Sequence, residues 1–292
     1  MKKLLLATTM LVGTAGFAAA EVTLSGDARM GIVDSGPGDV AFSSRARVAF
    51  TLSGETDGGL SFGASFRADN AGTNGAAAGG GAVNGDAGSV FISGAFGKLS
   101  MGDVDGAAQM ATGHVAGIGY TGVSDLNEST FLGAGSGLTD PTALYEYSTG
   151  AFTGYASVTN PGAPGDETYA IGAKYSTDAY TFGIGYEDTG AITHVVVKGS
   201  ATFSGVTVQA LYGEADLGAT KADQFAVSAG YSLDGIGLTA YYSDDSELPG
   251  GAKAYGIGAS YDLGGGAAIA GGVAKNQTAN TRLFDLGVTF KF

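Results

Sequence analysis

The chain has 292 residues, 28 of them acidic and 14 basic, with two histidines and no cysteine. The lack of cysteine excludes a disulfide framework, a thiolate metal site and a thiol nucleophile, and two histidines are too few for a histidine-based metal cage. No run of eighteen apolar residues follows residue 20, which excludes a helical membrane protein. The 53 glycines disfavour long helices, since each costs about 1 kcal/mol relative to alanine in a helix, so the all-β class remains.

Residues 1–20 predict a secretory signal peptide. Met1-Lys2-Lys3 precedes an apolar stretch that ends in Ala18-Ala19-Ala20, the basic, apolar and small-residue order of such peptides. The alternative is a transmembrane anchor, but threonines and glycines interrupt the apolar stretch. Cleavage after Ala20 would remove two lysines and no acids, leaving 12 basic and 28 acidic residues and a net charge of −16. A mature chain this acidic would repel the phosphates of nucleic acids.

Three segments at the start of the mature chain predict β-strands with one apolar and one polar face. Segment 21–32, EVTLSGDARMGI, alternates with a two-residue period, and 42–55, FSSRARVAFTLSGE, and 60–70, LSFGASFRADN, repeat the pattern. Their polar faces share a row of basic residues: Arg29, Arg45, Arg47 and Arg67.

Two loops interrupt the pattern. Residues 71–88 form a Gly-Ala stretch in which a phosphate-binding loop is disfavoured, because no Gly-Lys-Ser/Thr follows and no helix is predicted. A hairpin around Gly97 comes next. Residues 102–141 then lack alternation altogether, and a structureless segment of this length inside a compact domain is expected to be functional.

Beyond residue 141, short alternating segments follow one another to the end of the chain. The joints are in turn tight, as at Ser204-Gly205, Asp234-Gly235 and 264–266, and long and acidic, as at 216–223 and 244–251. Short turns on one rim and long loops on the other are typical of an outer-membrane barrel. We count about sixteen strands, an even number as antiparallel closure requires.

A soluble β-sandwich would alternate in the same way, so other features must decide between the two folds. Charges stand in mid-strand at Arg29, Arg45, Arg47 and Lys198, and the last strand ends on the aromatic Phe292. The apolar faces carry aromatic residues near strand ends, as in the girdles of membrane barrels: Tyr169, Tyr175, Tyr180, Tyr186, Tyr231, Tyr242, Tyr255 and Tyr261. We therefore predict one transmembrane antiparallel β-barrel domain over residues 21–292, apolar side outward.

Several segments resemble a known family. EVTLSGDARMGI, FSSRARVAFTLSG, GLSFGASF, SGAFGKLSMGD, YGIGASYDLGGGAAIAGG and DLGVTFKF are similar to segments of the trimeric, sixteen-stranded general-diffusion porins of purple non-sulfur bacteria and other alphaproteobacteria. The resemblance covers nearly all of the mature chain and is strongest at its two ends. It implies an outer-membrane homotrimer in contact with lipid and lipopolysaccharide, which passes small hydrophilic solutes and ions and is not an enzyme.

The resemblance also implies that residues 102–141 fold into the barrel and narrow it. Carried over by position, the basic side of the constriction is Arg29, Arg45, Arg47 and Arg67. The acidic side is drawn from the loop residues Asp103, Asp105, Asp125 and Glu128. Opposed charges across a water-filled pore create a transverse field that favours polar solutes. The alternative for the arginines is ion pairing with wall acids such as Asp27 and Asp69.

Other functions stay open at this point. Asp103 and Asp105 could supply oxygen ligands to calcium, although the later ligands of an EF-hand are missing, and no other cofactor is expected. His114 lies in the loop and His194 is expected at a rim, but no spacing marks a nucleophile with its base, so no catalytic residue is predicted. A substrate-specific sugar or anion channel, and a non-conducting envelope anchor or adhesin, are the alternatives to a diffusion pore.

Overall fold

The computed structural model describes residues 20–36, 38, 40–69, 86–133, 142–161 and 167–292. Residues 1–19 of the predicted signal peptide, most of the Gly-Ala loop and residues 134–141 of the long loop lie outside these ranges. The prediction of a cleavage after Ala20 therefore stays a prediction.

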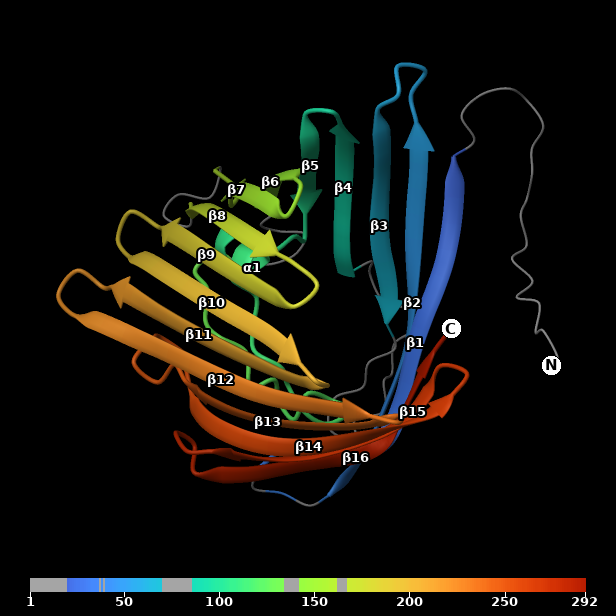
Figure 1. Ribbon diagram of the computed structural model, residues 1–292, viewed down its shortest axis with the longest axis vertical. Helices are drawn as coiled ribbons and strands as arrows, with labels where there is room; N and C mark the ends of the chain where they lie inside the picture. Colours follow the sequence, from blue (N-terminus) through green and yellow to red (C-terminus); the bar gives the residue numbers. More distant parts are fainter. Residues whose placement is uncertain (1–19, 37, 39, 70–85, 134–141, 162–166) are drawn as a thin grey trace.

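The described residues form a closed, all-antiparallel barrel of sixteen strands (Figure 1), which confirms the predicted fold. Neighbours in sequence pair all the way round, and β1 closes the barrel on β16 from Asp27 opposite Lys291 to Asp34 opposite Phe284. The strands and the one described helix are β1 (Glu21–Asp34), β2 (Ala41–Glu55), β3 (Ser61–Asp69), β4 (Asp86–Gly94), β5 (Gly97–Gly102), α1 (Ala107–Thr112), β6 (Thr142–Thr149), β7 (Phe152–Val158), β8 (Tyr169–Ser176), β9 (Tyr180–Asp188), β10 (Thr193–Phe203), β11 (Val206–Asp216), β12 (Lys221–Leu233), β13 (Ile236–Asp244), β14 (Lys253–Gly264), β15 (Ala267–Asn276) and β16 (Thr281–Lys291).

The alternation of the sequence decides which side chains face out. Apolar residues of one parity are exposed on the outer surface, for instance Leu24 at 62% and Ile257 at 63%. The opposite parity points inward, where Glu187, His194 and Gln224 are almost fully buried. Closure pairs the backbone groups along the wall, as a wall in hydrocarbon requires, because lipid offers no hydrogen-bond partners.

The two rims differ as the sequence predicts. Tight turns join β10 to β11 and β12 to β13 at Ser204-Gly205 and Asp234-Gly235, with φ of 49° and 80° at the first and 49° and 81° at the second. Two consecutive positive φ angles match the right-handed twist of paired strands, and a glycine in second place adopts one without steric cost. The opposite rim carries the longer connections, among them residues 103–141 between β5 and β6.

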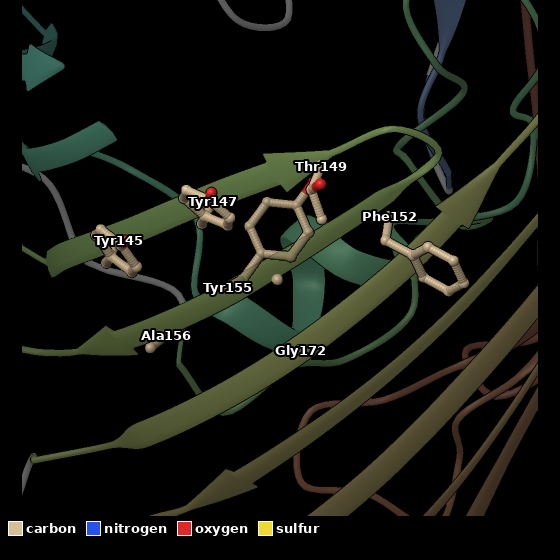
Figure 2. Close-up of a pocket in the computed structure, with 8 residues that line it drawn as sticks. Tyr145, Tyr147, Thr149, Phe152, Tyr155, Ala156 and Gly172 are labelled. Atoms are coloured by element: carbon tan, nitrogen blue, oxygen red, sulfur yellow. The ribbon is translucent and has the colours of Figure 1, made fainter. Parts of the chain in front are cut away.

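The outer surface carries the predicted aromatic residues close to the rims. Tyr242 of β13 lies directly opposite Tyr255 of β14 near the long loops, whereas Phe152 and Tyr175 pair near the short turns. On this surface Tyr145, Tyr147 and Phe152 line a groove of about 330 Å³ on β6 and β7 (Figure 2). These three side chains belong to the outward-facing set, but the buried Tyr155, which packs against α1, and Gly172 also line the groove.

One element was not predicted from the sequence. Residues 107–112, within the long segment without alternation, form α1, whose single turn and a half is too short to show helical periodicity. No helix in the described part of the chain is long and apolar enough to cross a membrane.

Candidate functional site

The segment after β5 runs through the interior of the barrel. Its helix α1 packs on the inner side of β7, β8, β9 and β10 (Figure 1). Ala107, Ala108 and Ala111 of this helix are buried against Leu144, Tyr155 and other residues of the wall. The inward-folded loop is thereby observed for residues 103–133.

Glycines of the wall make this close packing possible. A Cβ at Gly172 of β8 would lie 2.4 Å from the Ala107 carbonyl oxygen. One at Gly183 of β9 would lie 2.2 Å from the Ala111 carbonyl oxygen. Real Cβ atoms do not approach oxygen this closely, so any larger residue here would push the helix into the lumen.

The same principle holds on the far wall. Ile118 lies over Gly256, Gly258 and Gly272, where an added Cβ would approach its side chain to 3.0 Å or less. Tyr120 lies over Gly31 of β1 and Gly287 of β16, with 2.9 Å to an added Cβ at each. The segment therefore crosses the barrel interior from β8 to the β16–β1 seam along inward-facing glycines.

Polar groups of the wall satisfy the backbone of the inward segment. The Asp285 carboxylate accepts hydrogen bonds from the Thr121 N–H at 2.7 Å and the Thr121 hydroxyl at 2.6 Å. The Arg29 guanidinium donates to the Tyr120 carbonyl oxygen at 3.2 Å. Further bonds to the segment's backbone come from Ser157, Glu187, Lys198, Ser228, Ser243 and Asp245. A non-helical segment sealed inside a protein needs such partners for its peptide groups.

The four predicted basic residues lie on neighbouring strands, and three of them are ion-paired along the wall. Arg45 pairs with Asp27 at 2.6 Å, and Arg47 with Asp69 at 2.9 Å. Arg67 pairs with Asp69 at 3.3 Å. The ion pairing weighed from the sequence is therefore present. Arg29 instead faces the inward segment.

One predicted acid lies within electrostatic reach of this row. Burial raises the pKa of Asp125, and the positive charges of Arg29 and Arg45 lower it again. The pKa of Glu128 is raised by burial and then by the charges of Asp125 and Asp105. The pKa of Asp105 is raised by burial and by Asp103. The acids thus form a row along the segment, and Asp125 is its end nearest the arginines.

The backbone at this acid is strained. Val123, Ser124 and Asp125 have φ of 48°, 66° and 51°, a left-handed conformation that costs a side-chain-bearing residue free energy. Three such residues in succession are held by the surrounding contacts, among them the Ser243 hydroxyl on the Leu126 carbonyl oxygen at 2.6 Å. Strain of this kind is typical of functional positions.

Both histidines belong to this interior. His194 is the second residue of β10, near the start of the strand as expected, and its side chain is buried at 1% exposed. It bonds the Glu187 carboxylate at 2.9 Å and the Gln224 amide at 2.7 Å. His114 accepts the Ser129 N–H on Nδ1 at 3.0 Å, and its backbone carbonyl accepts from the Lys198 ammonium. The inward parity of residue 194 within the strand was the sequence signal for its burial.

The calcium site expected at Asp103 and Asp105 gains no geometric support. Among the described residues, no group of three or more His, Asp or Glu side chains is arranged to hold a metal ion. The site stays a prediction.

Comparison with known proteins identifies the family. A family model described as Gram-negative porin matches residues 7–281. The chain belongs to this family. The porin of Rhodobacter capsulatus is 39% identical, with 93% of this chain and all of the relative aligned, and the porin of Fuscovulum blasticum is 30% identical over the same shares. A porin structure refined at 1.8 Å resolution is 35% identical with a TM-score of 0.76, and a triple mutant of Rhodopseudomonas blastica porin is 26% identical with a TM-score of 0.76; each aligns with 93% of this chain and over its own full length.

Family and fold together give the function. This porin is a general-diffusion channel of the outer membrane, and its family implies a channel rather than an enzyme. The resemblance read from its strands is confirmed.

The packing of α1 on the wall glycines beneath it can be tested by substitution. Gly172→Val should push the segment toward the lumen, because its Cβ would lie 2.4 Å from the Ala107 carbonyl oxygen. We expect the single-channel conductance to fall by roughly half or more while the barrel still folds. The control is Gly154→Val on the neighbouring strand, where an added Cβ meets no atom within 4 Å. Equal conductance in the two variants would contradict the packing account.

His114 should make the segment sensitive to acid. Burial and then Lys198 lower its pKa below the ordinary 6.5, so the folded segment favours neutral His114. This stability is intact above pH 6.5 and is lost as the pH falls through the lowered pKa, where a protonated Nδ1 no longer accepts the Ser129 N–H. Losing one hydrogen bond of about 1 kcal/mol should raise the population of the displaced segment roughly five-fold. The open-channel current noise that this displacement causes should rise with it.

The control for this prediction is His114→Gln, which has no titrating group. Its noise should not change over the same pH range. An identical acid response in both proteins would show that His114 is not the responsible group.

Proposed function

We propose that small hydrophilic solutes and ions pass between Asp125 on the inward segment and Arg29 and Arg45 on the wall. The observation that carries this proposal is that the charges of both arginines act on Asp125, yet no ion pair joins them among the described residues. A separation beyond ion-pair contact is what the passage of a solute between opposed charges requires.

Opposed charges on the two sides of a narrow pore produce a transverse field. A polar solute can orient its dipole in this field, whereas an apolar solute would have to displace ordered water without compensation. Arg47 and Arg67 share the single carboxylate of Asp69 and Arg45 is paired with Asp27, so Arg29 is the one of these four arginines without an acidic ion-pair partner in the described part of the chain.

The arrangement disfavours the two alternatives. A substrate-specific sugar channel would present a run of aromatic side chains to the lumen, but the inward tyrosines Tyr120, Tyr155 and Tyr241 are 4–6% exposed. An anchor or adhesin would give the inward arginine row no role. Catalysis finds no support either, since His114 accepts the Ser129 N–H of the segment and His194 bonds the Glu187 carboxylate of the wall.

We also propose that the channel is a homotrimer embedded in lipid and lipopolysaccharide. The family resemblance supports it, and so does the apolar extension of β1: residues 21–25 pair with β2, but pairing with β16 starts only near residue 26. Val22 and Leu24 in this extension are 60% and 62% exposed, a surface that another subunit can cover. Outward tyrosines near both rims suit the lipid interface.

The charge proposal predicts opposite shifts of selectivity. Replacing Arg29 and Arg45 by glutamine should move the reversal potential in a salt gradient toward cations, and Asp125→Asn should move it toward anions. We expect the permeability ratio to change by roughly two- to three-fold, the effect of a potential change of about one kT. Arg282→Gln, at an exposed position near the rim, is the matched control and should leave the ratio unchanged. Unchanged reversal potentials in all variants would place the constriction elsewhere.

The trimer proposal predicts current steps that insert in threes in planar bilayers. The protein should also migrate as a detergent-resistant oligomer that dissociates on heating. Insertion strictly in single steps together with monomeric migration before heating would overturn it.

A further inference from the structure

The described part of the inward segment, residues 103–133, ends in a stretch whose backbone bonds titratable side chains. We call residues 129–133 the returning arm. The N–H groups of Ser129 and Thr130 donate to His114 Nδ1 at 3.0 Å and to the Asp245 carboxylate at 2.7 Å. Those of Leu132 and Gly133 donate to the two oxygens of Glu187, each at 2.9 Å. The arm's backbone therefore depends on side-chain acceptors rather than on a strand partner.

Glu187 is the centre of this attachment. It lies on β9, its side chain is 0% exposed, and Oε2 also bonds His194 Nδ1 at 2.9 Å. Gln224 of β12 in turn bonds His194 Nε2 at 2.7 Å, so three strands of the wall fix the carboxylate. A carboxylate buried to this degree is costly unless hydrogen bonds and charge partners offset its desolvation, and here both oxygens are engaged.

The approach of the arm to Glu187 needs a glycine. A Cβ at Gly133 would lie 3.0 Å from Glu187 Oε1 and 3.3 Å from Thr168 Cγ2. Thr168 adds a hydrogen bond from its hydroxyl to the Leu132 carbonyl oxygen at 3.3 Å. The peptide group between Leu132 and Gly133 is thus bound to the wall through both its carbonyl oxygen and its N–H.

The arm is directly connected to the acidic row. Glu128 precedes it immediately, and the Glu128 N–H donates to the Asp125 carbonyl oxygen at 3.0 Å. Phe131 of the arm lies between the two histidines, with ring centroids 5.4 Å from His114 and 6.2 Å from His194. Because the wall blocks movement outward, an arm freed from Glu187 moves toward the lumen, and Glu128 moves with it as far as the bonds of Ser129 and Thr130 allow.

We propose that Glu187 is the positioning residue of the constriction. Through the N–H groups of Leu132 and Gly133 it holds the returning arm against β9 and so sets how far Glu128 and Asp125 project toward the arginines. This inference rests on the proposed function of the channel, because it concerns the same constriction.

The test is Glu187→Gln, which keeps the size of the side chain but leaves one oxygen to accept where the carboxylate has two. We expect single-channel conductance to fall at least two-fold and the reversal potential to move toward cations, as acids enter the lumen. Removing a negative charge by itself would move it toward anions. The direction of the shift therefore separates displacement of the arm from a direct charge effect.

Two further variants complete the experiment. Gly133→Ala crowds Glu187 from the arm side without changing the wall, and it should shift both quantities in the same directions even if Glu187→Gln fails to fold. Thr202→Ala removes the hydrogen bond between the Thr202 and Thr207 hydroxyls, 2.9 Å long, which lies by the tight turn between β10 and β11 and does not involve the segment, so it should behave as wild type. Heat-modifiable migration in gels verifies that each barrel is folded.

The outcomes are distinguishable. A folded wild-type protein that does not conduct would contradict the proposed function itself. A conducting wild type with Glu187→Gln and Gly133→Ala unchanged, a shift toward anions, or the same effect from Thr202→Ala would overturn the role of Glu187 alone.

Discussion

The close contact between the inward segment and the glycines of the wall is the constraint on which the rest of this structure depends. A barrel of sixteen strands without it would have a wide lumen. Gly172, Gly183 and Gly185 let α1 lie flat on one side, and Gly31 and Gly287 receive Tyr120 at the closing seam. These packing contacts determine the path of the segment's backbone. The positions of the charged side chains on the segment follow from that path.

Once the backbone is placed, buried polar groups keep it there. Peptide groups inside the barrel need partners, and Asp285, Glu187 and Asp245 supply acceptors to Thr121, Leu132 and Thr130. These wall acids hold the segment's backbone, whereas the segment itself carries a separate row of acids from Asp103 to Glu128. Polar residues of the wall therefore help to determine where the segment lies.

Much of the fold could be predicted because its signals are local. Two-residue alternation gives the strands and their faces, and Ser204-Gly205 and Asp234-Gly235 give the tight rim. The arginine row follows from the parity of three strands. The path of the inward segment could not be predicted, because it depends on contacts between residues far apart in sequence, such as Thr121 with Asp285. The glycines that receive it read as weak strand residues, and the left-handed Val123 and Ser124 carry no sequence signal. Burial of His194 was available from its parity and was missed.

The central claim is that solutes pass beside Asp125 while α1 is sealed against the wall. The chain has no cysteine, so single cysteines report cleanly. The most direct measurement is the conductance of Asp125→Cys and Ala108→Cys channels during exposure to a membrane-impermeant, bulky thiol reagent. The account predicts stepwise loss of current for Asp125→Cys and none for Ala108→Cys, whose parent side chain is 0% exposed. Labelled Asp125→Cys channels that conduct as before, or rapid block at residue 108, would contradict it.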